Sequence, residues 1–318
     1  MRIRDAYKMR KHMCFVVALG VVLLSSRLAL TADAYTQVGS TLDLAVGTRS
    51  RALGGATVGV PDCGASVFCN PAWLGWAEER SAVSCVGIRP NIAGWGHVAL
   101  ATTGIGIGMH YFDFGSIPQT DEFGNTTGEF SYRAVGLVAA TSVVLGDLPE
   151  LQDSFVAECV GFGVSFKMLK VNTVDPGDGL GFALDASFLL HADPPPFLQP
   201  TLNCLSFGMV AENRLGAPIR YDTGHSERWD RQLSIGGSVE LAEQWLLAVD
   251  LAGNGNVHIG LEWMPLAAFA FRVGAQHVGT WILSLGCGMH LKELTLDLAF
   301  CTHPFLSGEV SGSLGYCW

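Results

Sequence analysis

Residues 160–168 read VGFGVSFKM, and this stretch decides the fold. Large apolar residues occupy its even positions, whereas glycine, serine and lysine occupy its odd positions. Successive side chains of a β-strand point to opposite faces, so a period of two predicts a strand with one apolar and one small or polar face. The stretch therefore predicts a β-strand.

The same alternation recurs on both sides of this stretch, for example in residues 180–188 and 294–300. Strand-like segments follow one another from residue 81 onward and are separated by turns. The predicted strands are 81–90, 93–102, 104–114, 130–142, 155–170, 179–190, 202–213, 230–241, 244–252, 255–264, 266–276, 281–290, 292–302 and 307–318. This count of about 14 is even, as in single-chain bacterial outer-membrane barrels.

A soluble β-sandwich would show similar alternation, so the composition decides between the two architectures. Hydrophobic residues make up 49% of the chain and charged residues only 15%, with 39 glycines; soluble domains carry about 25% charged residues. In nearly every segment one face is unbroken and apolar, as lipid requires, and the other suits a lumen. Strands can span a membrane only as a closed barrel. The prediction is an all-β, transmembrane antiparallel barrel of about 14 strands.

The connections and the chain end agree with a barrel. Residues 115–129 and 214–229 are long and polar, as extracellular loops are, and Asn254-Gly255 marks a tight turn. The last strand places Leu314, Tyr316 and Trp318 on one face. An aromatic final residue on a lipid-facing strand resembles the signal that the barrel assembly machinery reads, so this machinery is an expected partner, along with outer-membrane lipid.

The first residues have the layout of a secretory signal peptide. Five basic residues lie among the first eleven, an apolar run covers residues 13–24, and small-residue cleavage sites lie near residues 30–34. A membrane anchor helix is the alternative, but the run has about 12 residues where about 20 are needed. We therefore expect residues 1–34 to be removed on export.

The charge balance limits the partners of the exported chain. The whole chain has a net charge of −10. Removing residues 1–34 takes away six basic and two acidic residues, which leaves 13 basic and 27 acidic residues and a net charge of −14. This balance argues against nucleic acid, or an anionic lipid surface, as the main partner.

Motifs for catalysis or metal binding are missing from the sequence. It has no G-x-S-x-G, P-loop, G-x-G-x-x-G or H-E-x-x-H motif, and no Cys/His cluster at zinc spacing. Cys63 and Cys69 could close a small disulfide loop, while the other cysteines are expected to pack as small apolar residues. His110, His258 and His290 are expected to face the lumen or the interface. We predict no catalytic residue, cofactor or metal, and an outer-membrane enzyme is disfavoured.

Residues 35–80 do not alternate like barrel strands. Small residues dominate this stretch, Gly54-Gly55 allows close backbone approach or positive φ, and Asn70-Pro71 starts a turn. A segment that packs inside a barrel requires such small residues. Arg51 to Ala56, then Asp62, then Asn70 to Leu74 resemble the N-terminal hatch of the FadL-like outer-membrane proteins.

The resemblance extends to PorV-type barrels and to the FadL-like barrels of spirochaetes. Downstream, residues 163–167, 184–187, 260–263, 271–274 and 297–300 are similar to strands of this family, so it covers almost the whole mature chain. It implies a hatch at residues 35–80 that plugs a barrel at 81–318. It also implies passage of long-chain fatty acids or similar hydrophobic molecules, in some members by lateral escape through the wall.

The chain is shorter than typical transporters of this family, which leaves its substrate open. The alternative function is that of a PorV-type barrel, which does not transport but docks exported proteins at the outer membrane. The polar loops at 115–129 and 214–229 could serve such docking.

Two groups of site residues follow. The candidates for latching the hatch and gating the ligand are Arg51, Gly54, Gly55, Asp62, Asn70, Pro71 and Ala72. An Arg51–Asp62 ion pair is one expectation for the latch. The charged residues on the predicted lumenal face are Lys167, Asp185, Glu240, Glu262, Arg272, Glu293 and Asp297. They either satisfy one another and hold strands and hatch together, or they form a path for the head group of an amphipathic ligand.

Overall fold

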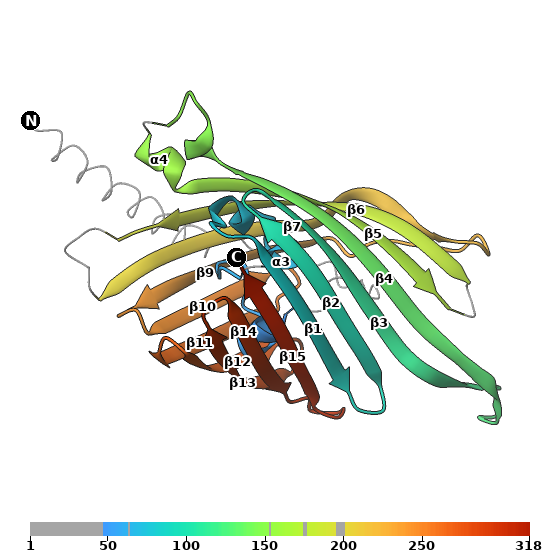
Figure 1. The fold of residues 1–318 in the computed structure, drawn as a ribbon. Coiled ribbons are helices and arrows are strands. Elements are labelled where there is room, and N and C mark those ends of the chain that lie inside the picture. The colour runs from blue at the N-terminus through green and yellow to red at the C-terminus, as the bar shows by residue number, and fades with distance from the viewer. Residues whose placement is uncertain (1–46, 63, 153, 174–176, 195–200) are drawn as a thin grey trace, which may run out of the picture.

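The structure, a computed structural model, describes residues 47–62, 64–152, 154–173, 177–194 and 201–318. Within these residues fourteen antiparallel strands form the wall of a barrel (Figure 1). The wall strands are β1 (Ser81–Arg89), β2 (Ala93–Thr102), β3 (Ile105–Thr120), β4 (Thr126–Val144), β5 (Val160–Asn172), β6 (Asp178–Ala192), β7 (Leu202–Tyr221), β9 (Gln232–Leu241), β10 (Trp245–Ala252), β11 (Val257–Leu266), β12 (Phe269–His277), β13 (Trp281–Leu291), β14 (Leu294–Cys301) and β15 (Glu309–Cys317). The two-residue strand β8 (Ser226–Glu227) pairs only with β7.

The sheet closes on itself. Each wall strand pairs with its neighbours along the chain, and β1 pairs with β15, so that Ser81 lies opposite Cys317. Closure leaves no unpaired edge, which a barrel in lipid requires because no water reaches its backbone groups. The predicted antiparallel barrel of about 14 strands is confirmed.

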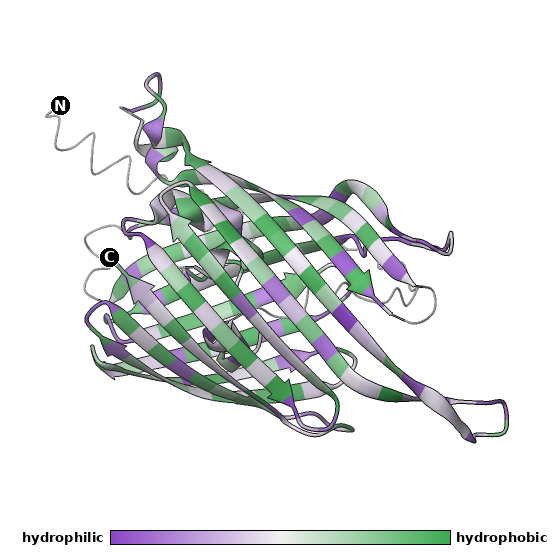
Figure 2. Ribbon diagram, turned by 45° about the vertical axis from the view of Figure 1, so that its right-hand side comes forward, coloured by the Kyte–Doolittle hydropathy of each residue, from purple (hydrophilic) through white to green (hydrophobic). Residues whose placement is uncertain are grey.

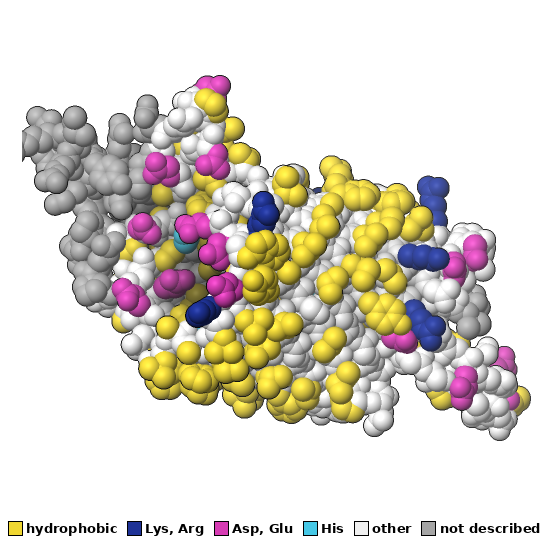
Figure 3. All heavy atoms as spheres, viewed as in Figure 1, with side chains coloured by type: hydrophobic (Ala, Val, Ile, Leu, Met, Phe, Trp, Pro, Cys, Tyr) yellow, Lys and Arg dark blue, Asp and Glu magenta, His cyan; other side chains and the backbone are white. Residues whose placement is uncertain are grey.

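The two faces of the wall differ as the alternation predicted. In β10 every second residue is buried, and Trp245, Leu247, Val249 and Leu251 between them are exposed. Large exposed apolar residues recur in this way around the wall, and Figure 2 shows the resulting bands along the strands. In Figure 3 apolar side chains cover much of the visible wall. Such a surface is suited to lipid rather than water.

We name the two ends of the barrel by what lies there. The loop end carries the projecting β3–β4 hairpin, and the terminal end is where β1 begins and β15 ends (Figure 1). The short helices are α2 (Thr48–Ala52), α3 (Ser66–Cys69), the 3-10 helices η2 (Pro71–Trp76) and η3 (Leu145–Asp147), and α4 (Phe155–Glu158). None of the helices in the described residues is long and apolar enough to cross a membrane.

Three segments differ from the sequence prediction. Residues 155–158 form α4, so β5 begins only at Val160 and not at residue 155. The predicted loops 115–129 and 214–229 are largely strand, because β3 and β4 continue as a paired hairpin and β7 runs on to Tyr221. Polar composition predicted loops outside lipid, but cross-strand hydrogen bonds can continue in water and keep such segments as strands.

Candidate functional site

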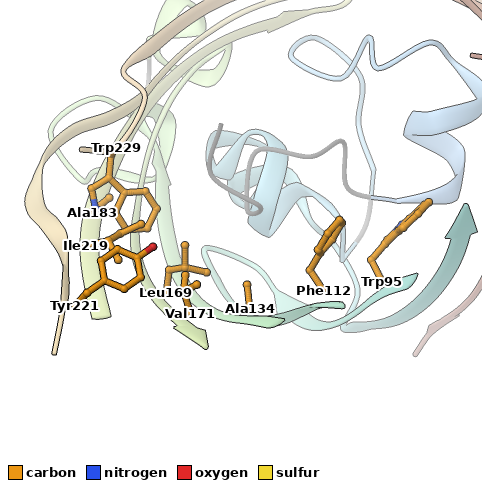
Figure 4. Packing of buried hydrophobic residues seen from close by; sticks show 9 residues of the cluster. All are labelled: Trp95, Phe112, Ala134, Leu169, Val171, Ala183, Ile219, Tyr221 and Trp229. Atoms are coloured by element: carbon orange, nitrogen blue, oxygen red, sulfur yellow. The ribbon is translucent and has the colours of Figure 1, made fainter. Parts of the chain in front are cut away.

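The chain between residue 47 and β1 lies inside the barrel. We call residues 47–77, apart from residue 63, the inner segment; Figure 4 shows it as pale blue ribbon within the ring of strands. Helix α2 packs against β12 to β15, whereas η2 packs against β4, β5 and β6 on the other side of the lumen. The inner segment therefore bridges opposite parts of the wall.

Glycines permit the closest approach between the inner segment and the wall. Gly54 and Gly55 both have positive φ, at 66° and 82°. Gly274 of β12 faces Gly54. A Cβ on Gly274 would collide with the backbone of the inner segment, and a Cβ on Gly54 would collide with the backbone of β12. The Gly54-Gly55 pair thus serves both purposes expected from the sequence, a left-handed turn and backbone-to-backbone contact.

A buried ion-pair chain ties the inner segment to the wall. Arg49 of α2 contacts Glu262 of β11 at 2.7 Å, Glu262 contacts Arg272 of β12 at 2.5 Å, and Arg272 contacts Asp297 of β14 at 2.5 Å. Glu262 and Arg272 are each 2% exposed. Arg49 also donates to the carbonyl oxygen of Pro61 at 2.5 Å. Buried charges such as these need one another, because each alone would carry a large desolvation cost.

A second ion-pair cluster involves Arg51. Its guanidinium lies 3.0 Å from Glu309 of β15, which also contacts Arg89 of β1 at 3.2 Å. Arg51 also lies over the ring of Trp95, 5.2 Å from its centroid. The expected Arg51–Asp62 pair is therefore wrong, because the wall supplies a carboxylate directly facing Arg51. Burial raises the pKa of the Asp62 carboxyl, and the charge of Arg49 partly opposes this shift.

Wall side chains also hold the backbone of the inner segment. Asp250 of β10 accepts hydrogen bonds from the amides of Thr57 and Val58, at 2.5 and 2.9 Å. Ser238 of β9 donates to the carbonyl oxygen of Gly59 at 2.6 Å. These contacts satisfy backbone groups that no regular secondary structure serves. They fix the turn that follows Gly54-Gly55.

Asn70, Pro71 and Ala72 form a buried corner of the inner segment. The Asn70 side chain donates to the carbonyl oxygen of Val58 at 2.7 Å and accepts from the amide of Ala72 at 3.1 Å. The Ala72 amide also donates to Ser187 of β6 at 3.0 Å. Pro71 is the first residue of η2, where its missing N–H costs nothing. The corner thus joins two parts of the inner segment to each other and to the wall.

Replacing Asn70 with alanine, alone or together with Pro71→Ala, is expected to lower the free energy of unfolding by about 1–3 kcal/mol. The change leaves the Val58 carbonyl without its donor in a fully buried place. Denaturant unfolding and the rate of protease cleavage within the inner segment measure the effect. Asn125→Ala, in an exposed turn, is the control and should change the free energy by less than about 0.5 kcal/mol. Equal behaviour of the two variants would contradict the role given to Asn70.

Lys167 and Asp185 pair with each other inside the wall, 2.8 Å apart, away from the ion-pair chain. Asp185 also accepts from Ser165 at 2.8 Å and from the backbone amide of Asn213 at 2.8 Å. Asn213 lies in a bulge of β7, with φ 54°, where the register with β6 shifts. The pair therefore stabilises an irregular place in the wall.

Among the other charged residues expected on the lumenal face, Glu262, Arg272 and Asp297 form ion pairs with one another. Their geometry therefore fits the expectation that these charges hold strands and hatch together. Glu293 lies exposed in the turn before β14 and does not face the lumen, which corrects its assignment. The alternation was extended one residue too far, into a turn with Lys292 at φ 53°.

An apolar lining covers the inside of the wall between the inner segment and the loop end. It is made by one buried cluster of side chains from β2 to β7 and the chain after β8 (Figure 4). The cluster comprises Trp95, Phe112, Ala134, Leu169, Val171, Ala183, Ile219, Tyr221 and Trp229. We call this cluster the inner lining. It presents aromatic and aliphatic groups where a water-filled pore would have charges.

Two buried histidines lie where the inner lining meets the inner segment. His97 of β2 and His110 of β3 are cross-strand neighbours. They lie two residues along their strands from the Trp95–Phe112 pair, on the same face. The rings are stacked with centroids 6.4 Å apart, and Phe68 of α3 packs edge-on against His97. Their exposures are 4% and 1%, and none of their four ring nitrogens has a hydrogen-bond partner in the described part of the chain. Buried polar groups without partners are rare and call for an explanation.

Sequence reasoning missed several residues of this site. Arg49, Asp250 and Glu309 make contacts as direct as those of the expected latch residues. The signal for Asp250 was present, because it lies on the inward face of an alternating strand. Cys63 lies outside the described residues, so the expected Cys63–Cys69 loop is not described. In the described ranges no group of three His, Cys, Asp or Glu side chains is arranged to hold a metal ion.

Comparison with solved structures identifies known proteins that share the fold of this chain. No family model matches the chain, and a search of curated proteins finds no match either. The solved structures of several channels do match. The Pseudomonas putida toluene transporter TodX has a TM-score of 0.58 and 13% identity, over 89% of this chain and 99% of that one. The Ralstonia pickettii toluene transporter TbuX has a TM-score of 0.57 and 14% identity, over 86% and 97%.

A FadL homologue of Pseudomonas aeruginosa matches with a TM-score of 0.53 and 11% identity, over 86% of this chain and 98% of that one. These matches cover almost the whole barrel. Because the sequence identity is low, the likeness concerns the fold alone. The chain has the fold of the FadL-like outer-membrane barrels.

Proposed function

We propose that this protein lies in the bacterial outer membrane and carries long-chain fatty acids or similar hydrophobic molecules across it. In this proposal residues 1–34, which lie outside the described residues, direct export. The observation that carries the proposal is the inner lining, a cluster of buried aromatic and aliphatic side chains on the lumenal face of β2 to β7. The solved channels of the same fold include transporters of toluene, which supports a hydrophobic ligand.

The inner segment acts as a hatch in this proposal. It bridges the lumen, and the ion-pair chain from Arg49 to Asp297 and the Arg51–Glu309 pair hold it to the wall. A ligand that enters along the inner lining would meet it before reaching the terminal end. The hatch must therefore shift, or the wall must open beside it, for the ligand to pass. The candidates for gating are Arg51, Gly54, Gly55, Asp62, Asn70, Pro71 and Ala72.

The polar groups at the inner end of the lining favour an acid over a neutral arene. His97 and His110 offer unpartnered ring nitrogens, and Arg51 lies close by over Trp95. A carboxylate accepts hydrogen bonds from imidazole and guanidinium groups, whereas toluene has no acceptor to offer. A fatty acid could place its head group there and its chain along Trp95 and Phe112.

Binding of a radiolabelled long-chain fatty acid to the refolded, detergent-solubilised barrel tests the proposal. We expect saturable binding that a short-chain acid does not match. The double variant H97F/H110F should weaken it about tenfold, because a hydrogen bond to a charged group contributes about 1.5–3 kcal/mol. The control H277F/H303F changes two histidines outside the lumen and should leave binding unchanged.

The outcomes separate the parts of the proposal. If the folded wild-type barrel binds no long-chain acid, fatty acid transport is contradicted. If it binds equally well with and without His97 and His110, the head group lies elsewhere while the transport proposal stands.

Docking of exported proteins is the second candidate function. The observation in its favour is the excursion of residues 145–159 at the terminal end, which includes η3 and α4 and projects beyond the wall (Figure 1). It exposes Leu148, Leu151 and Val156. Exposed apolar groups outside a membrane often mark protein contacts. Deleting residues 147–156 should then abolish export of partner proteins without changing fatty acid binding.

A further inference from the structure

The exposed cations of the described wall strands lie in one sector. Within the described strands, exposed Lys and Arg residues occur on β4, β5 and β7 and on no other strand. These residues are Arg133, Lys170, Arg214 and Arg220. In Figure 3, Lys and Arg side chains appear where the apolar cover of the wall ends toward the loop end.

The strand register places two of these cations in one row and a third in the next row toward the loop end. Lys170 of β5 lies opposite Leu180 of β6, and Leu180 lies opposite Arg220 of β7. Arg133 of β4 lies opposite Asn172, two residues farther along β5 toward the loop end. Adjacent strands are about 4.8 Å apart, so Lys170 and Arg220 stand about 10 Å apart with Leu180 between them.

The row of Lys170 and Arg220 is the edge of the lipid-facing surface. The next row toward the middle of the wall consists of Leu137, Met168, Phe182 and Ala217 and has no charge. The row beyond Lys170 and Arg220, toward the loop end, contains Arg133, Asn172 and Asp178. Long cationic side chains at such an edge can lay their stems on apolar surface and reach the head-group region.

The acidic neighbours do not fully neutralise these cations. Arg133 contacts Asp113 at 3.1 Å, and Lys170 contacts Asp178 at 3.8 Å. Both cationic side chains remain more than half exposed, at 54% and 61%. Exposed pairs of this kind contribute little free energy and can exchange partners. Arg220 has no ion pair among the residues that the structure describes.

We propose that Arg133, Lys170 and Arg220 bind the phosphate of an anionic phospholipid, whose acyl chains lie on the apolar rows of β4 to β7. Three cations beside an unbroken hydrocarbon surface fit a ligand with a phosphate and two chains. The net negative charge of the whole protein disfavours a general attraction to anionic lipid, and Asp113, Asp178 and Asp222 lie beside the three cations. The selectivity must therefore come from direct contact between the cations and the phosphate. The site is independent of what the lumen carries.

Selective lipid association tests the proposal. The refolded full chain is placed in phosphatidylcholine bilayers, and the association of spin-labelled phosphatidylglycerol is compared with that of spin-labelled phosphatidylcholine. We expect a preference of about fivefold for the anionic lipid, the effect of roughly one net cation at a membrane surface. In R133Q/K170Q/R220Q the preference should fall to about one, and in wild type it should weaken at high salt.

The control variant R80Q/R231Q/K292Q removes the same charge at exposed positions outside this sector and should keep the preference. Heat-dependent mobility on gels checks that every variant is folded. A wild-type preference near one overturns the proposal, and so does an undiminished preference in R133Q/K170Q/R220Q. Loss of the preference in 10 mM inorganic phosphate, at constant ionic strength, would also overturn it, since the site would then recognise free phosphate.

Discussion

Replacing Glu262 with alanine is expected to lower the free energy of unfolding by about 3–5 kcal/mol. The Glu262 carboxylate lies 2.7 Å from Arg49 and 2.5 Å from Arg272. Its removal leaves both guanidinium groups without this partner, and Arg272 is almost fully buried. Denaturant unfolding of the refolded chain in phospholipid vesicles, followed by tryptophan fluorescence, measures the change.

Glu293→Ala is the matched control for Glu262→Ala. Glu293 is an exposed glutamate in a turn of the same part of the barrel, so its loss should change the free energy by less than about 0.5 kcal/mol. Arg49→Met separates the two partners of Glu262, because it releases the inner segment but keeps the Glu262–Arg272 pair. We expect it to increase protease cleavage of the inner segment with a smaller loss of stability. If the two glutamate variants have the same free energy of unfolding, the ion-pair chain does not stabilise the folded barrel.

Much of the barrel could be predicted because strand alternation is a local property. Val160 to Met168 shows its period within nine residues, and β5 covers all of that stretch. Residues 155–159 were misassigned because Phe155 and Val156 continue an apolar pattern, although the chain turns there before entering the wall. The β3–β4 hairpin was shortened because polar strands that continue into water lack the apolar face that marks a strand.

The partners within the site could not be predicted, because they depend on geometry that no local pattern carries. Arg49 and Glu262 are 213 residues apart in the sequence. Which carboxylate meets which arginine is set by the stagger of all the strands between them and by the position of the inner segment. The sequence resemblance indicated the segment that lies inside the barrel, but the expected Arg51–Asp62 pair joined two residues that are close in the sequence. The wall contributes Glu309 to Arg51 instead.

Replacing Gly274 with leucine is expected to displace the inner segment. Gly274 faces the backbone of Leu53 and Gly54, and a side chain there has no space. Overpacking of this kind costs about 1–3 kcal/mol, which would raise the population of barrels with a displaced inner segment about 5- to 150-fold. Ion conductance in planar bilayers and protease cleavage within residues 47–77 should both rise accordingly, because a displaced segment opens a water path and exposes its own backbone.

Gly94→Leu is the control that makes this result specific. Gly94 is also a strand glycine, but the nearest atom to a Cβ there is the Gly87 carbonyl oxygen at 4.0 Å, so a side chain meets no obstacle. Its conductance and protease resistance should match wild type. If Gly274→Leu stays as closed and as resistant as Gly94→Leu, backbone contact with β12 does not position the inner segment. The ion pairs of Arg49 and Arg51 would then have to hold it alone, and Glu262→Ala should by itself open the barrel.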